Sequence, residues 1–128
     1  VWSIAPNASV YEAISEMAER GIGALPVMER DQLVGIISER DYARKVILNG
    51  RASQSIKVEE IMTRDVVCAN LAQSVNECLS VMTDRRVRHL SVVDEGKVID
   101  MLSIGDLVKA TMAEQRQLIT QLEQYIRG

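Results

Sequence analysis

The stretch SVYEAISEMAERGIGALPVMERDQLVGIISERD, residues 9–41, returns 65 residues later as SVNECLSVMTDRRVRHLSVVDEGKVIDMLSIGD, residues 74–106. Ten of the 33 aligned pairs are identical without any gap, and others exchange one aliphatic residue for another, such as Ile14 for Leu79. Self-similarity at a fixed offset is typical of a fold built from copies of one structural unit. The sequence therefore predicts two copies of a single unit.

Each copy carries the same order of local signals. A Ser-x-x-Glu capping box at Ser9, and again at Ser74, predicts the start of a helix with its apolar residues on one face. Gly21 is a strong stop for the first helix, and Arg86 is a weaker stop for the second. Apolar runs at 24–28 and 33–37, and at 89–93 and 98–102, are separated by polar turns and predict hairpins.

A second helix is expected after Ser38 and after Ser103, and short extended segments at 1–4 and 66–69 precede the first helices. We therefore expect an α+β fold with two strand-helix-strand-strand-helix units. The first unit spans 1–50, a linker spans 51–62, and the second unit spans 63–128 with a long C-terminal helix. An apolar stripe near the end of that helix is a candidate dimer contact or output element; its members are Leu118, Ile119, Leu122, Tyr125 and Ile126.

Composition excludes several classes of function. The 128 residues carry a net charge of −3, which disfavours a broad basic surface for nucleic acid. We see no apolar run long enough for a membrane span and no signal peptide. Cys68 and Cys78 are expected to be reduced thiols in a cytoplasmic protein. His89 is the single histidine, so a zinc site built on several imidazoles is excluded.

The Ser-x-x-Asp motifs at Ser38–Asp41 and Ser103–Asp106 have two interpretations. One is a helix cap, because serine caps well and an early aspartate suits the helix dipole. The other is a clamp in which the carboxylate holds two vicinal ribose hydroxyls while serine and free N–H groups face a phosphate. Recurrence in both copies does not discriminate, because duplication copies caps and sites alike.

The cations around these motifs differ between the copies. Arg40 and Arg44 in the first copy are matched by Gly105 and Lys109 in the second. Conversely, Arg88 and His89 are matched by Gly23 and Ala24. Any two sites built on these motifs should therefore bind ligands unequally. A catalytic role for His89 would need a nucleophile and an orienting carboxylate that the sequence does not place, so no enzyme activity is expected.

The duplication, the Ser-x-x-Asp motifs and the stretches GIISERDYARK (residues 35–45) and RHLSVVD (residues 88–94) together resemble a tandem cystathionine-β-synthase (CBS) domain pair, or Bateman module, of the small stand-alone bacterial type. The resemblance implies two βαββα units packed about a pseudo-twofold axis with two clefts between them. It also implies adenosine-containing ligands such as AMP, ADP, ATP, NAD or S-adenosylmethionine, and pairing of modules into a homodimer.

Carried onto this sequence, the resemblance implies roles for individual residues. Asp41 and Asp106 would hold ribose hydroxyls, with Ser38 and Ser103 beside the ribose or phosphate. Arg40, Arg88 and His89 would meet phosphate. Adenine would lie in one cleft near Ser3, Ile4, Ala24 and Pro26, and in the other cleft near Met62, Val67, Cys68 and Leu90.

Three departures from the family pattern make the second site less certain. Ser91 stands where the family usually has proline, Leu71 replaces the proline that the first copy keeps at Pro6, and Asp100 stands where glycine is usual. If Asp100 points inward, its charge would oppose a phosphate.

We expect a non-catalytic regulatory module that binds an adenine nucleotide (AMP, ADP, ATP or NAD), requires no cofactor, forms a homodimer, and contacts neither membrane nor nucleic acid. The alternative is a ligand-free dimerisation scaffold.

Overall fold

The computed structural model describes residues 2–127 and contains two similar units in succession. The first unit holds α1 (Val10–Arg20), β1 (Ala24–Glu29), β2 (Gln32–Ser38), α2 (Glu39–Tyr42) and a π-helical turn η1 (Ala43–Ile47). After α3 (Val58–Ile61), the second unit holds β3 (Cys68–Ala69), α4 (Val75–Arg85), β4 (His89–Asp94), β5 (Lys97–Ser103) and α5 (Ile104–Arg127). The predicted α+β fold with a long C-terminal helix is confirmed.

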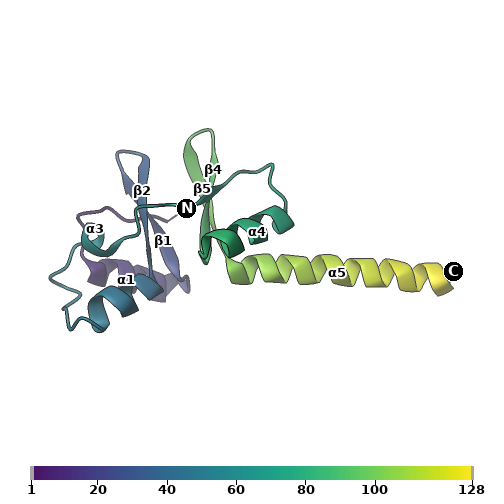
Figure 1. Cartoon of the computed structure of the whole chain (residues 1–128), viewed down its shortest axis with the longest axis horizontal. Helices are drawn as coiled ribbons and strands as arrows, with labels where there is room; N and C mark the ends of the chain where they lie inside the picture. Colours follow the sequence, from purple (N-terminus) through teal and green to yellow (C-terminus); the bar gives the residue numbers. More distant parts are fainter. Residues whose placement is uncertain (1, 128) are drawn as a thin grey trace.

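Each unit is built on a hairpin, and the two hairpins stand side by side in Figure 1. β1 pairs antiparallel with β2, and β4 pairs antiparallel with β5 and parallel with β3. The register shifts after Val27 in the first hairpin and after Val92 in the second, at equivalent positions. The expected strand at 1–4 is reduced to a single parallel bridge between Ile4 and Val27, and Val1 lies outside the described residues.

Capping sets the ends of the first helix in each unit. Ser9 and Ser74 accept hydrogen bonds from the backbone N–H groups of Glu12 and Glu77 at 3.1 Å each. Gly21 ends α1 in the left-handed conformation with φ of 65°, and Arg86 ends α4 in the same conformation with φ of 54°. The helix α4 therefore ends at the position equivalent to the end of α1. Because a residue with a side chain is strained in the left-handed conformation, Arg86 adopts it at a local cost in energy.

Two apolar clusters form the cores of the two units. The first includes Met17, Leu25 and Ile37, and the second includes Met82 and Leu90. The segment predicted as a linker, 51–62, packs into the first cluster through four of its residues: Ile56, Val58, Ile61 and Met62. This packing fixes the path of the chain as it leaves the first unit.

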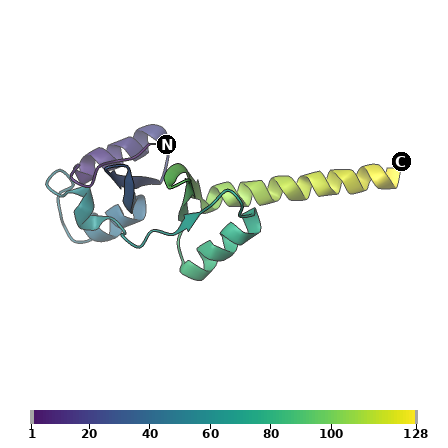
Figure 2. The same cartoon turned by 90° about the horizontal axis from the view of Figure 1, so that it is seen from above.

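The long helix α5 runs away from both units in two perpendicular views (Figures 1 and 2). Leu107 is its only buried residue in the described part of the chain. The apolar residues near its far end are between 53 and 86% exposed; they are Leu118, Ile119, Leu122, Tyr125 and Ile126. Within residues 2–127, no helix has the length and hydrophobicity needed to cross a membrane.

Candidate functional site

A cleft of about 780 Å³ opens where the two units meet. The first unit contributes the end of β2 and the start of α2, and the second contributes the segment before β3 and the start of β4. We call it the Asp41 cleft. Its walls are formed by Gly23, Ile36, Ser38, Glu39, Arg40, Asp41, Arg44, Lys45, Thr63, Asp65, Val66, Val67, Arg86, Val87, Arg88 and His89.

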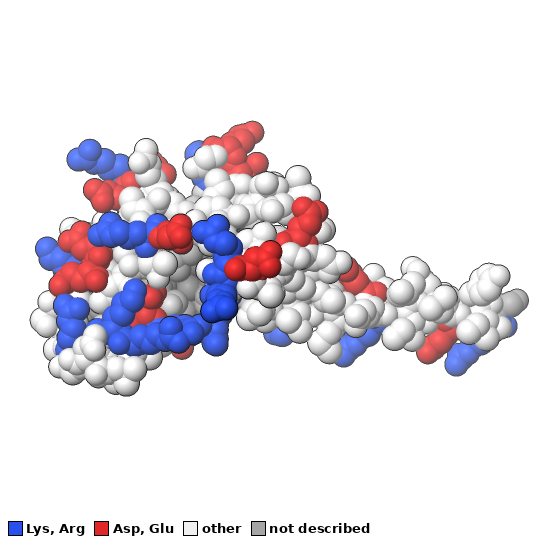
Figure 3. Space-filling view, in the orientation of Figure 1, with Lys and Arg blue, Asp and Glu red and all other residues white. Residues whose placement is uncertain are grey.

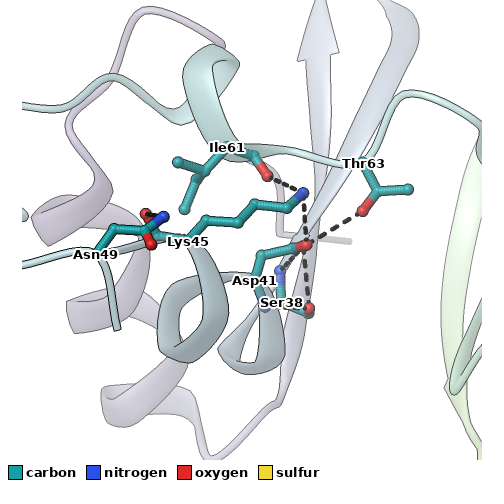
Figure 4. A network of polar contacts seen from close by, with 6 residues as sticks. All are labelled: Ser38, Asp41, Lys45, Asn49, Ile61 and Thr63. Atoms are coloured by element: carbon teal, nitrogen blue, oxygen red, sulfur yellow. Dashed lines mark hydrogen bonds and ion pairs between the residues drawn. The ribbon is translucent and has the colours of Figure 1, made fainter. Parts of the chain in front are cut away.

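Asp41 lies at the centre of a polar network in this cleft (Figure 4). Its Oδ2 accepts hydrogen bonds from the backbone N–H and the hydroxyl of Ser38, both at 3.0 Å. Its Oδ1 accepts from the Thr63 hydroxyl at 3.2 Å and forms an ion pair with Lys45 Nζ at 3.1 Å. Lys45 Nζ also donates to the carbonyl of Ile61 at 2.8 Å. The carboxylate is 8% exposed, and this network balances its burial.

Cations gather around the same cleft. Five line it: Arg40, Arg44, Lys45, Arg86 and Arg88. Three carboxylates, of Glu39, Asp41 and Asp65, oppose them. Figure 3 shows Lys and Arg side chains grouped around a hollow on one face of the molecule. The charge of neighbouring Arg44 lowers the pKa of Arg40, with smaller effects from burial and from Arg88, because like charges disfavour the protonated form. Such crowding favours an anionic ligand.

His89 stands in the wall shared by this cleft and a second one. Burial lowers the pKa of its imidazole, with a further contribution from Arg88, while Asp106 and Glu39 act in the opposite direction. The imidazole lies beside Gly23, where a Cβ would lie 3.4 Å from His89 Nε2, an ordinary van der Waals contact. The imidazole therefore lines both clefts.

The second cleft, of about 420 Å³, contains Asp106 and is called the Asp106 cleft. Its walls are formed by Trp2, Gly21, Ile22, Gly23, Ala24, His89, Asp100, Met101, Ser103 and Asp106. The backbone N–H of Ser103 donates to Asp106 Oδ2 at 2.9 Å, and the backbone N–H of Asp106 donates to Ser103 Oγ at 3.1 Å. The Ser103 backbone bond is the main cause of the lowered pKa of Asp106, with smaller effects from Ser103 Oγ, Lys109 and His89. Unlike Asp41, Asp106 is exposed.

The structure distributes the sequence-predicted site residues unevenly. Six line the Asp41 cleft: Ser38, Arg40, Asp41, Val67, Arg88 and His89. Four line the Asp106 cleft: Ala24, His89, Ser103 and Asp106. Six others, Ser3, Ile4, Pro26, Met62, Cys68 and Leu90, line neither cleft.

Packing explains the placement of three of those six. Pro26 and Leu90 are fully buried core residues, and Met62 is 7% exposed because it packs onto Gly35 in the first cluster. Asp100, whose direction the sequence left open, does line the Asp106 cleft.

Sequence reasoning missed several lining residues. Thr63 reaches Asp41 from the segment between the units, and Lys45 reaches it from one helical turn further along the chain. The spacing of Lys45 from Asp41, four residues on a helix, was a usable signal. Trp2, at the opening residues of the chain, gave no such signal. Its ring contacts the guanidinium of Arg20, whose Cζ lies 4.0 Å from the ring centroid.

Comparison with known proteins accounts for this architecture. The Arabidopsis thaliana protein "CBS domain-containing protein CBSX3, mitochondrial" is 41% identical over 125 residues, which cover 94% of this chain and 61% of that protein. This chain therefore spans less than two thirds of that relative. A solved CBS-domain protein from Burkholderia ambifaria MC40-6 is 51% identical with a TM-score of 0.85, and the match covers 90% of this chain and 85% of that one.

A further solved structure is the CBS domain pair of protein MJ0100 in complex with 5-methylthioadenosine and S-adenosyl-L-methionine. It is 26% identical with a TM-score of 0.77, and the match covers 89% of this chain and 91% of that chain. The family model described as "CBS domain" matches residues 1–48 and again residues 58–113. The chain belongs to the CBS domain family and carries two consecutive copies of the domain.

Proposed function

We propose that the chain is a non-catalytic regulatory module that binds an adenine nucleotide in the Asp41 cleft. The observation that carries this proposal is the meeting of a Ser-x-x-Asp helix start with five cations in one cleft between the units. The carboxylate suits ribose hydroxyls, the cations suit phosphate, and Ile36, Val66 and Val67 offer apolar surface for a base. The adenosine compounds bound by the MJ0100 pair support this class of ligand.

The Asp41 network indicates how binding would change the structure. Because Ser38 holds Oδ2, a ribose hydroxyl has to exchange with Thr63 or Lys45 at Oδ1. Release of Lys45 would free an ammonium group for phosphate. Release of Thr63 would loosen the segment that leads into the second unit. A ligand that binds the exchanged state more tightly than the original state would shift the equilibrium between the two arrangements of the units, by the ratio of its two affinities.

The alternative is a scaffold that binds no nucleotide and uses Asp41 only as a helix cap. Isothermal titration calorimetry with AMP, ADP, ATP and NAD separates the two proposals. For the nucleotide that binds, Arg88→Gln should weaken binding about tenfold or more, because one charge-assisted hydrogen bond is lost. Arg30→Gln is the matched control, since Arg30 is exposed in the turn between β1 and β2 and lines neither cleft, and the affinity of this variant for the nucleotide should be unchanged. No binding by any of the four nucleotides would favour the scaffold.

We also propose that two copies associate through α5, as a homodimer. The exposed apolar stripe of Leu118, Ile119, Leu122, Tyr125 and Ile126 would be covered by the same stripe of a second copy. Charge complementarity supports an antiparallel arrangement. Arg116 and Glu123 lie seven residues apart beside the stripe, so a twofold axis near residues 119–120 brings each next to the opposite charge of the other copy.

Light scattering tests this association. A chain ending at Met112 should be monomeric, and a truncated chain that stays dimeric would contradict a contact through α5. Arg116→Glu should weaken the dimer, and adding Glu123→Arg in the same chain should restore it, because the pairing is reversed and not removed. Equal weakening by the single and double variants would contradict the antiparallel arrangement.

A further inference from the structure

The two clefts carry the same helix-start motif but offer different carboxylates. Asp41 is buried, and both of its oxygens have partners. Asp106 is exposed, and in the described part of the chain no side chain donates a hydrogen bond to its Oδ1. Asp41 Oδ1 is held by Lys45 and Thr63, whereas Lys45 is matched in the second unit by Ala110, which offers no ion pair. Asp106 therefore has an oxygen free for a ligand hydroxyl without any exchange.

The charges of the clefts also differ, and the repeat shows how. Five cations line the Asp41 cleft, whereas no Lys or Arg is among the residues that line the Asp106 cleft. At the equivalent positions, four of the five cations are replaced by small uncharged residues: Arg40 by Gly105, Lys45 by Ala110, Arg86 by Gly21 and Arg88 by Gly23. The fifth, Arg44, is matched by Lys109, which lies outside the lining of the cleft but close enough to lower the pKa of Asp106.

A carboxylate is added where cations are lost. Asp100 lines the Asp106 cleft, and its counterpart in the first unit is Gly35. Asp100 Oδ1 accepts a hydrogen bond from the backbone N–H of Met101 at 2.8 Å. The nearby cation Arg20 lies over the Trp2 ring and is paired with Glu16 at 2.7 Å. A phosphate in this cleft would thus face two carboxylates, of Asp100 and Asp106.

We infer that the Asp106 cleft selects adenosine compounds whose 5′ substituent is uncharged or positively charged, and rejects those that carry a 5′-phosphate. This inference rests on the proposed binding of adenosine compounds by the two units. Asp106 Oδ1 accepts from a ribose hydroxyl, the Trp2 ring and Met101 offer surface to the base, and Asp100 repels phosphate and attracts a cation. The two clefts therefore respond to different ligands.

Trp2 gives a direct readout of the Asp106 cleft, because it lines the cleft and is the single tryptophan of the chain. Its fluorescence should change on titration with adenosine and with 5′-amino-5′-deoxyadenosine, at concentrations at least tenfold lower than with AMP. Calorimetry of the same samples detects binding in either cleft, so AMP binding that leaves the Trp2 fluorescence unchanged is assigned to the Asp41 cleft, where no tryptophan lies. A Trp2 response to AMP at concentrations equal to those for adenosine would overturn the inference.

Asp100→Asn keeps the shape and the side-chain oxygen that accepts from the backbone N–H of Met101, but removes the charge. It should tighten AMP binding in the Asp106 cleft, followed by Trp2 fluorescence, about tenfold, which is the effect expected for one unit charge in a partly screened cleft. Asp94→Asn is the matched control, since Asp94 ends β4 on the same hairpin, is exposed, and lines neither cleft. Equal effects of the two substitutions would overturn the role of Asp100.

The outcomes separate this inference from the proposed function. Calorimetric binding of AMP without any Trp2 response to adenosine would refute the inference and leave the proposed function standing. Absence of binding for all of these compounds in both measurements would refute both.

Discussion

Replacing the two equivalent aspartates by alanine should have unequal effects on stability. Asp106→Ala removes an exposed capping interaction, which costs about 1 kcal/mol of unfolding free energy. Asp41→Ala removes a similar cap, leaves the Thr63 hydroxyl without its acceptor, and removes the ion pair of Lys45, which keeps the Ile61 carbonyl. Hydrogen bonds to a buried charge add about 1.5–3 kcal/mol, which the partial exposure of Lys45 reduces. We expect a total cost near 3 kcal/mol for Asp41→Ala.

Urea unfolding followed by circular dichroism measures the difference. The midpoint should fall much further for Asp41→Ala than for Asp106→Ala, with the same slope in both. Thr63→Val and Lys45→Met, each made in the otherwise unchanged chain, should lower the midpoint by part of the Asp41→Ala loss, because each removes one of the same contacts. Equal losses for the two aspartates would refute the network as a source of stability.

Three further substitutions follow from local geometry. Arg86→Gly should raise the unfolding free energy by about 1 kcal/mol, because glycine adopts the left-handed conformation without strain; a decrease in melting temperature would contradict this. Gly35→Ala should cost about 1–3 kcal/mol in urea unfolding, because its Cβ would lie 2.7 Å from Met62 Sδ and 2.9 Å from the Thr63 carbonyl, and an unchanged midpoint would show that the neighbours relax freely. Burial lowers the pKa of His89, so below its ordinary value of 6.5 the unfolded chain binds more protons than the folded chain, and stability falls as the pH is lowered. His89→Gln should reduce the loss of unfolding free energy between pH 7 and pH 5, and an equal loss in both proteins would assign the pH dependence to other groups.

The fold was largely predictable because its signals are local and occur twice. Capping serines at Ser9 and Ser74 and alternating apolar runs need no distant partner to act. The segments that needed one were predicted less well. Ile4 forms a single bridge to Val27 and no longer strand, because the extent of an extended segment depends on how far it pairs with a neighbouring strand, which local sequence does not specify.

The site was predictable to the extent that it repeats a motif. The Ser-x-x-Asp spacing located both helix starts, and the side chains of Arg88 and His89 reach the Asp41 cleft as expected. Met62, Pro26 and Leu90 line neither cleft; a residue near a site and a residue beneath it look alike in sequence. All three are apolar, and packing directs them into the core.

What distinguishes the two clefts lies at positions that the repeat does not conserve. The serine and the aspartate stabilise the helix start in both units, which favours their retention after duplication whatever the clefts bind. Neither helix start depends on Lys45, whose counterpart Ala110 offers Asp106 no ion pair, or on Gly35, whose counterpart Asp100 adds a charge. Both changes lie next to a retained motif and alter its surroundings without altering the helix. Ligand preference can therefore diverge between the two units while both helix starts are kept.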